Sequence, residues 1–208
     1  MEKSPFYVVQ EFVSPYMCED LIDACDFNVP DEDKDGHYIK TTKTCERAEA
    51  VIYDRLLYLL PELQAHYVFQ YKGTERVEFE WFPEGSKGTF RSENSEYVRN
   101  KWLRTRARDF TAILFMSDYQ EKIPFEQDYE VYGGKLEFVQ HKFGFNPQRG
   151  TLIVFPSDPH FINVTSDIRA GDLYQARVQI AAQTPYIYRP DMFPGNYTTW
   201  FKPLLQAG

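Results

Sequence analysis

Apolar and polar positions change their period along the chain, from helical spacing near the start to strand-like alternation later. Ser14 followed by Pro15 is a typical helix start, because serine caps the first turn and proline suits its first position. The apolar spacing after it predicts a helix over 17–25, and a second apolar stripe predicts a helix over 45–60 that ends before Pro61. We expect a first strand over 6–13 and a polar, turn-rich loop over 28–43.

From Tyr67 onward the pattern has period two. The segment RVEFEW at 76–81 alternates charged with apolar residues, which is typical of a half-buried strand. Two helices followed by many short strands favour a helix-supported barrel or sandwich. We predict a single domain over 1–208, with a helical support region at 1–66, a β core at 67–182 and an aromatic, proline-rich tail at 183–208. Further strands are expected at 103–116, 134–142, 151–155, 159–164 and 172–182.

Composition and charge fit an ordinary soluble globular chain. The sequence is 43% hydrophobic and 26% charged, and its aromatic content of 17% favours strands. The net charge of −8 argues against general binding to nucleic acid or to an anionic membrane. The three cysteines form no metal-binding spacing and are expected to be core thiols. With no signal-peptide pattern or membrane-spanning stretch, we predict a cytoplasmic protein.

Several blocks of the sequence stand out in a fixed order. They are SPYMCEDLI at 14–22, FPEG at 82–85, RDFTAILFMS at 108–117, GGKLEF at 133–138, PQRGTLIVFPS at 147–157, and then His160. In this order the blocks resemble the prolyl-4-hydroxylase-like 2-oxoglutarate/Fe(II) oxygenase superfamily. The resemblance implies a double-stranded β-helix, which is a jelly-roll or cupin-like fold, with Fe(II) and 2-oxoglutarate as cofactors.

The resemblance also implies an iron site, and one ligand position departs from the pattern. Such enzymes hold Fe(II) with two histidines and one carboxylate, which leaves positions open for the co-substrate and oxygen. The superfamily supplies the first two ligands from an H-x-D motif, and here that motif reads Arg91-Ser92-Glu93. Glu93 supplies a carboxylate and His160 stands in the place of the distal histidine. Arg91 cannot replace a histidine, because a guanidinium has no lone pair to donate and carries a positive charge.

Three interpretations of this site stay open. In the first, iron binds through Glu93, His160 and a substitute ligand or water. In the second, the fold persists without metal, and Arg91 fills the place of the cation and pairs with Glu93. In the third, a different set of residues serves. His141 is the only other histidine of the β core, and the sequence does not place it near the site. Taken without the resemblance, His160 reads as an ordinary packed or surface histidine, and Glu93 reads as a solvated turn carboxylate.

The expected anchor for 2-oxoglutarate also departs from the pattern. Leu173 stands where close relatives within the superfamily place a basic residue, two positions after Gly171. Arg177 would share a strand face with Leu173 and could pair with a carboxylate in bidentate fashion. The alternative for Arg177 is a position on the outside of the barrel. The one basic concentration is either an anion groove or a solvated sheet face; it comprises Arg99, Lys101, Arg104, Arg106 and Arg108.

Two functions therefore follow from the sequence. The first is a dioxygenase that hydroxylates a small molecule or a protein side chain. The alternative is a non-catalytic double-stranded β-helix protein that has lost metal binding and acts as a ligand- or partner-binding module. The substrate pocket is expected among loops 28–43 and 118–132 and the aromatic tail, since loops vary freely between relatives.

Overall fold

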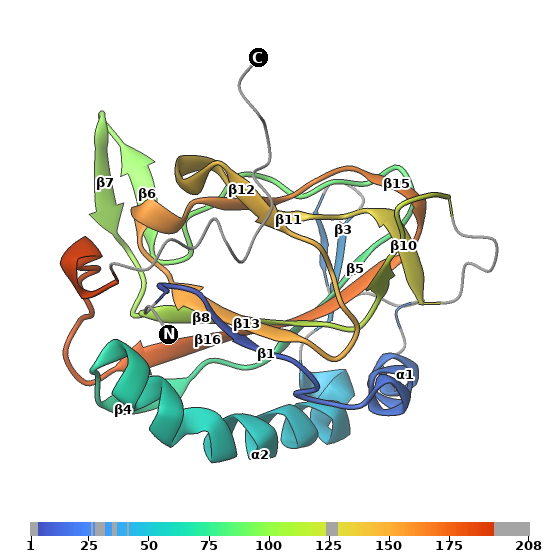
Figure 1. The fold of residues 1–208 in the computed structure, drawn as a ribbon, viewed down its shortest axis with the longest axis horizontal. Coiled ribbons are helices and arrows are strands. Elements are labelled where there is room, and N and C mark those ends of the chain that lie inside the picture. The colour runs from blue at the N-terminus through green and yellow to red at the C-terminus, as the bar shows by residue number, and fades with distance from the viewer. Residues whose placement is uncertain are drawn as a thin grey trace.

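A large antiparallel sheet divides the molecule, with two α-helices on one side and smaller sheets on the other (Figure 1). A computed structural model describes residues 4–25, 27, 32–34, 37–40, 42–123 and 129–193. Within these residues the chain is mainly β, as the pattern predicted, and its α-helices are α1 (Pro15–Ala24) and α2 (Thr42–Tyr67). Among the described residues, neither α-helix has the length and the apolar composition of a membrane-spanning segment.

The large sheet, which we call the major sheet, has β16 near its centre. Its order is β1-β13-β8-β16-β5-β3-β2, with β4 also paired to β16, and its neighbouring strands are antiparallel. Because side chains alternate between the faces of a strand, β16 sends one set toward the helices and the other toward the smaller sheets. The strands are β1 (Tyr7–Val9), β2 (Glu32–Lys34), β3 (His37–Lys40), β4 (Tyr71–Thr74), β5 (Glu78–Phe82), β8 (Phe110–Phe115), β13 (Leu152–Pro156) and β16 (Leu173–Ala182).

The helices cover one face of the major sheet with an apolar layer. The N-terminus of α1 forms as predicted, because the Ser14 hydroxyl accepts a hydrogen bond from the Met17 N–H at 3.2 Å. The two helices bury one apolar stripe each against the inner residues of the central strands. This core includes Leu21, Ile52, Leu56, Phe79, Leu114, Val178 and Ile180.

The smaller sheets cover the opposite face and enclose a second core rich in phenylalanine. One has the order β15-β10-β9 and another β12-β11-β14. The core between these smaller sheets and the major sheet, which we call the interior, includes Phe82, Ile113, Phe115, Phe138, Phe155 and Leu173. The strands are β9 (Asp118–Tyr119), β10 (Glu130–Gly133), β11 (Leu136–Phe138), β12 (Phe143–Phe145), β14 (Asn163–Thr165) and β15 (Ile168–Gly171), and a separate hairpin joins β6 (Ser95–Val98) to β7 (Lys101–Arg104).

Several predicted boundaries differ from the structure. The loop predicted at 28–43 contains β2 and β3, which extend the major sheet. Helix α2 continues through Pro61 to Tyr67. A proline inside a helix removes one backbone hydrogen bond. Here the buried side chains of Leu63 and Tyr67 hold the following turns against the core.

The strand predictions also need correction at three places. The strand predicted at 103–116 is divided into β7 and β8, and the residues between them leave the sheet. The strands predicted at 134–142 and 159–164 each contain a short 3₁₀ helix, which are η1 (Val139–His141) and η2 (Pro159–Phe161). The predicted tail is described to residue 193, including η3 (Pro190–Met192), and the rest of it lies outside the described residues. The three cysteines are buried and free, which confirms the prediction of core thiols.

Candidate functional site

The segment that follows β5 carries Arg91 and Glu93 along the edge of β14. The N–H of Gly88 donates to the carbonyl of Thr165 at 2.9 Å. Farther along, the backbones of Arg91 and Asn163 exchange hydrogen bonds of 3.0 and 3.1 Å. This antiparallel strip holds the Glu93 side chain inside the protein, where the residue is only 4% exposed.

Arg177 lies on the interior face of β16. Leu173, Gln175, Arg177 and Gln179 share this face, as the strand period predicted, and Arg177 is 1% exposed. Its position is therefore inside the barrel-like core and not on its outer surface. The neighbouring strand β5 pairs Gln175 with Glu80, so a second buried carboxylate lies beside the arginine.

Two arginines and two glutamates meet in the interior, and we call these four side chains the Arg–Glu cluster. It consists of Glu80, Arg91, Glu93 and Arg177. Arg177 Nη1 donates to Glu93 Oε1 at 2.8 Å, and its Nε lies 3.2 Å from Glu80 Oε2. Arg91 Nη2 donates to Glu80 Oε1 at 2.9 Å, and its Nε lies 3.1 Å from Glu93 Oε1. Each arginine thus bridges both glutamates.

Buried amides complete the hydrogen bonding of the cluster. Gln179 Nε2 donates to Glu93 Oε2 at 3.0 Å, and Gln175 Nε2 donates to Glu80 Oε2 at 2.5 Å. The His37 imidazole stacks on Phe82 and places its Nε2 3.5 Å from Glu80 Oε1. Each of the four glutamate oxygens therefore has a nitrogen partner, which is the condition under which buried carboxylates are tolerated.

The charges of the cluster keep its members ionised. Burial by itself raises the pKa of Glu80, but the charges of Arg177 and Arg91 outweigh burial and hold that pKa well below its usual value. The same balance, with Arg177 as the larger favourable charge, lowers the pKa of Glu93. Burial acts to lower the pKa of Arg91, whereas Glu93 and Glu80 raise it above its ordinary value. Two positive and two negative charges make the cluster formally neutral.

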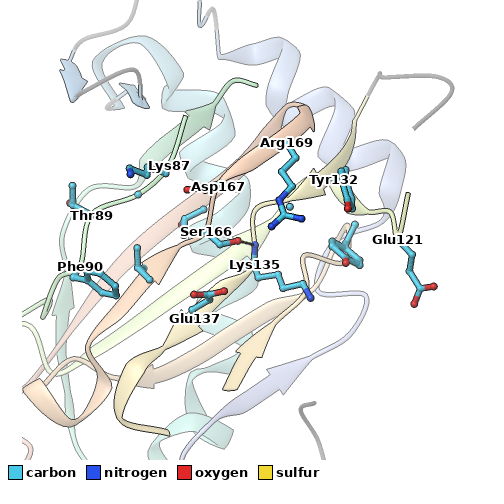
Figure 2. A pocket seen from close by; sticks show the side chains of 15 residues that line it. Lys87, Thr89, Phe90, Glu121, Tyr132, Lys135, Glu137, Ser166, Asp167 and Arg169 are labelled. Carbon is cyan, nitrogen blue, oxygen red and sulfur yellow. Dashed lines mark hydrogen bonds between the residues drawn. The ribbon is translucent and has the colours of Figure 1, made fainter. Parts of the chain in front are cut away.

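A separate pocket of about 800 Å³ lies on the outward face of the smaller sheets, and we call it the outer pocket. Figure 2 shows Lys135, Tyr132 and Arg169 on one side of it and Thr89 and Phe90 on the other. A narrow recess of about 30 Å³ lies next to it, shares the backbone strip at 87–89, and is lined by Arg91 and His37. The segment 118–132, predicted to shape a pocket, contributes Tyr119, Glu121 and Tyr132 to the wall.

The arrangement of sheets around the cluster is found in known structures. A viral collagen prolyl hydroxylase from Paramecium bursaria Chlorella virus-1, in complex with 2OG, matches with a TM-score of 0.63 and 16% identity over 87% of this chain and 97% of that one. The chain has the fold of the prolyl 4-hydroxylases.

Further solved structures share this prolyl 4-hydroxylase fold. A prolyl hydroxylase from Trichoplax adhaerens, in complex with a peptide fragment of hypoxia inducible factor, has a TM-score of 0.63 and 14% identity over 86% of this chain and 84% of that one. A prolyl-4-hydroxylase from Pseudomonas putida has a TM-score of 0.58 and 12% identity over 87% and 94% of the two chains. No family profile and no curated protein matches the sequence. Likeness at this identity establishes the fold and not the activity.

The cluster does not fit the iron centre that the prolyl 4-hydroxylase fold suggests. Both oxygens of Glu93 accept hydrogen bonds from Arg177 and Gln179, and the Arg91 guanidinium lies against one of them. A divalent cation needs those lone pairs, and two guanidinium groups would repel it. Within the described ranges, no three side chains of the His, Cys, Asp or Glu type gather as a ligand set. Arg177, the expected anchor for 2-oxoglutarate, is likewise engaged with both glutamates.

The structure does not bring His160 to this cluster. His160 lies on η2, where its side chain is 62% exposed and its Nδ1 is 2.8 Å from Asp158 Oδ1. The residue that faces Glu93 from this part of the chain is Asn163, whose Nδ2 lies 3.4 Å from Glu93 Oε1. His141 lies on η1 and packs against Phe6 and Phe161, and burial lowers its pKa to about 4. The structure therefore does not bring Glu93 and His160 together at one site. Their assignment as metal ligands stays a prediction.

The basic stretch does not form one anion groove on a single strand. Arg104 on β7 donates to Asp109 at 2.9 Å. Arg108 lies beyond the end of β7 and forms two hydrogen bonds to the Glu75 carboxylate. Both arginines are thus neutralised within the protein, whereas Arg99, Lys101 and Arg106 remain on the exposed hairpin and its exit.

Sequence reasoning missed the buried polar residues that complete the cluster, namely Glu80, Gln175, Gln179 and Asn163. Glu80 looked like the solvent-facing residue of an alternating strand, but it is 0% exposed. A usable signal was Phe82, because it follows Glu80 by two and lies on the same strand face. Because a large aromatic residue such as Phe82 favours a buried strand face, the glutamate on the same face is expected to be buried as well. A buried glutamate then needs a cationic partner.

Proposed function

We propose that this chain is a metal-independent binding protein built on a double-stranded β-helix, in which the Arg–Glu cluster takes the place of an iron centre. The observation that carries the proposal is the occupation of both Glu93 oxygens by Arg177, Arg91 and Gln179. In this role the interior is a structural core, and binding takes place at the outer surface of the fold. The elements at 1–66 and the tail then belong to the same single domain as the β core.

The test is metal analysis of purified protein together with turnover of 2-oxoglutarate to succinate on the same sample. We expect no stoichiometric iron, no succinate above the blank, and no rise in melting temperature when Mn(II) replaces EDTA at a constant 2-oxoglutarate concentration, since a metal ion that binds the native state raises that temperature. Stoichiometric metal in the protein as purified, or succinate formation that depends on added Fe(II), would refute the proposal.

The second candidate is a 2-oxoglutarate/Fe(II)-dependent oxygenase that hydroxylates a small molecule or a protein side chain. The observation that favours it is the fold shared with the viral enzyme, whose structure is a 2OG complex. It requires Arg91 and Arg177 to leave Glu93, so that the carboxylate and a histidine can reach one metal ion. The same paired measurement separates the two candidates, because an active oxygenase consumes 2-oxoglutarate only when Fe(II) is present.

A further inference from the structure

The outer pocket is distinct from the interior, because its walls are the outward faces of the smaller sheets. On β11, Leu136 and Phe138 point into the phenylalanine core, and Glu137 between them lines the pocket. On β15, Ile168 belongs to the core and Arg169 lines the pocket. The alternation of these strands therefore creates a second site that shares no side chain with the Arg–Glu cluster.

Two cations of the pocket are positioned by aromatic rings. The Lys135 ammonium lies 5.2 Å from the centre of the Tyr119 ring, and the Arg169 guanidinium carbon lies 5.7 Å from the centre of the Tyr132 ring. Within the described part of the chain, neither cation makes an ion pair with a carboxylate. A cation held over a ring keeps its N–H donors free for a ligand, and the ring limits the rotamer freedom that binding would otherwise cost.

The backbone beneath these cations is held in place by close contacts. The Lys135 N–H donates to the Ser166 hydroxyl at 3.0 Å, which joins the β10–β11 connection to the β14–β15 connection. Gly133 has a φ of +100°, and a Cβ at that position would lie 2.2 Å from the Asp167 carbonyl oxygen. Only glycine allows this approach. These contacts fix the two connections against each other, so Lys135 and the neighbouring Arg169 on β15 lie on the same side of the pocket (Figure 2).

The remaining charges of the pocket limit the type of ligand. Glu137 lies apart from the Arg169 head group in Figure 2, and the pocket also contains the carboxylates of Asp167 and Glu121 and the cation of Lys87. Carboxylates at these positions would repel a polyanion such as a nucleic acid strand. They would accept hydrogen bonds from a hydroxyl or an ammonium group. The pocket volume of about 800 Å³ is in the range of small-molecule sites.

We infer that the outer pocket binds a small organic ligand whose oxyanion, a carboxylate or a phosphate, lies between Lys135 and Arg169 and whose hydroxyl or ammonium donor faces Glu137. Phe90, at 70% exposure, is available to cover an apolar part of the ligand. This inference deepens the proposed function, because it names the site and the ligand class of a binding protein, but it does not require the interior to be free of metal.

The experiment is calorimetric titration of the metal-free full-length protein, in the presence of EDTA, with three probes: inorganic phosphate, succinate and 2-oxoglutarate. Lys135→Gln and Arg169→Gln each remove one charged donor. A charge-assisted hydrogen bond contributes about 1.5–3 kcal/mol, so each substitution should weaken binding at least ~10-fold. The double variant should abolish binding. Comparing the affinity for phosphate with the affinity for succinate shows whether the pocket prefers a phosphate or a carboxylate.

The matched control is Lys72→Gln with Arg76→Gln, which makes the same charge change on exposed residues outside the pocket. The control should retain the wild-type affinity. The inference is overturned when no probe gives saturable binding, or when the control weakens binding as much as the pocket variants do. Failure of the proposed function has a different signature, which is 2-oxoglutarate consumption that begins only when Fe(II) replaces EDTA.

Discussion

Replacing Arg177 with methionine tests whether the Arg–Glu cluster supports the fold. The guanidinium is 1% exposed and contacts both Glu80 and Glu93, so its removal leaves two buried carboxylates with Arg91 as the remaining cation of the cluster. Breaking a buried ion pair by removing one partner costs about 3–5 kcal/mol. Single domains have free energies of unfolding of about 5–15 kcal/mol. We therefore expect Arg177→Met to remove a large share of the stability at neutral pH.

The pH dependence separates this electrostatic effect from the loss of packing. In the wild-type protein the pKa values of Glu80 and Glu93 are lowered, so their stabilisation is present above the unfolded-state pKa of glutamate and is lost as the pH falls through the folded-state pKa. Without Arg177, Arg91 is the remaining cation of the cluster that opposes burial, so both pKa values should rise above those of the wild-type protein. The two glutamates can then take up protons in the folded state at moderately acidic pH, so the difference from wild type should shrink as the pH falls below neutral.

The assay is urea unfolding of both proteins at a series of pH values, compared through the free energy of unfolding and the m-value. Arg149→Met is the matched control, because Arg149 Nη1 also lies 2.8 Å from a glutamate, but this partner, Glu19, has a side chain that is 36% exposed. Solvent screening limits that pair to about 1 kcal/mol or less. A destabilisation by Arg177→Met that stays constant with pH, or one no larger than the control, would refute the electrostatic account.

Three further outcomes follow from the structure. The double variant Arg91→His with Asn163→His places two imidazoles beside Glu93, but Arg177 still occupies that carboxylate. The absorption of coordinated Co(II) should therefore appear only when Arg177→Gln is added to the two histidines, and neither wild type nor the double variant should show it. Gly133→Ala should lower the free energy of unfolding by about 1–3 kcal/mol or more in thermal or urea melts, because of its positive φ and the Asp167 carbonyl. Burial raises the pKa of Cys18 to about 12, so this thiol should react with Ellman's reagent at pH 8 only as fast as the protein unfolds; a fast native reaction would contradict its burial.

The order of the sequence blocks was sufficient to predict a prolyl 4-hydroxylase-like fold, although identity to the solved structures is as low as 12%. Turn glycines and alternating apolar positions survive such divergence because they specify backbone geometry. Arg91, Glu93 and Arg177 could each be singled out, but their meeting could not be predicted. That meeting depends on the pairing of the Arg91 segment with Asn163 on β14, which is distant in sequence and which no local pattern encodes.

The position of His160 illustrates a second limit. Motif spacing gave it the place of a ligand, but Pro159 and the Asp158 cap turn this segment into a 3₁₀ helix, which sends the imidazole to the surface. The strand begins again at Asn163, and its side chain then points toward Glu93. A shift of three residues along the chain therefore changed which side chain entered the interior, and spacing by itself does not resolve such a shift.

The strip at 85–91 connects the outer pocket to the Arg–Glu cluster. Its amides at Gly85, Gly88 and Arg91 donate to carbonyls of the 163–168 segment at 2.9 to 3.0 Å, one every third residue. Lys87 on this strip lines the outer pocket, and Arg91 belongs to the cluster. We expect one opening event to release all three amide protons, so they should share one opening free energy once each exchange rate is divided by its intrinsic rate. Hydrogen exchange at these sites would thus report the separation of this edge from the sheet, and a ligand in the outer pocket would slow all three together.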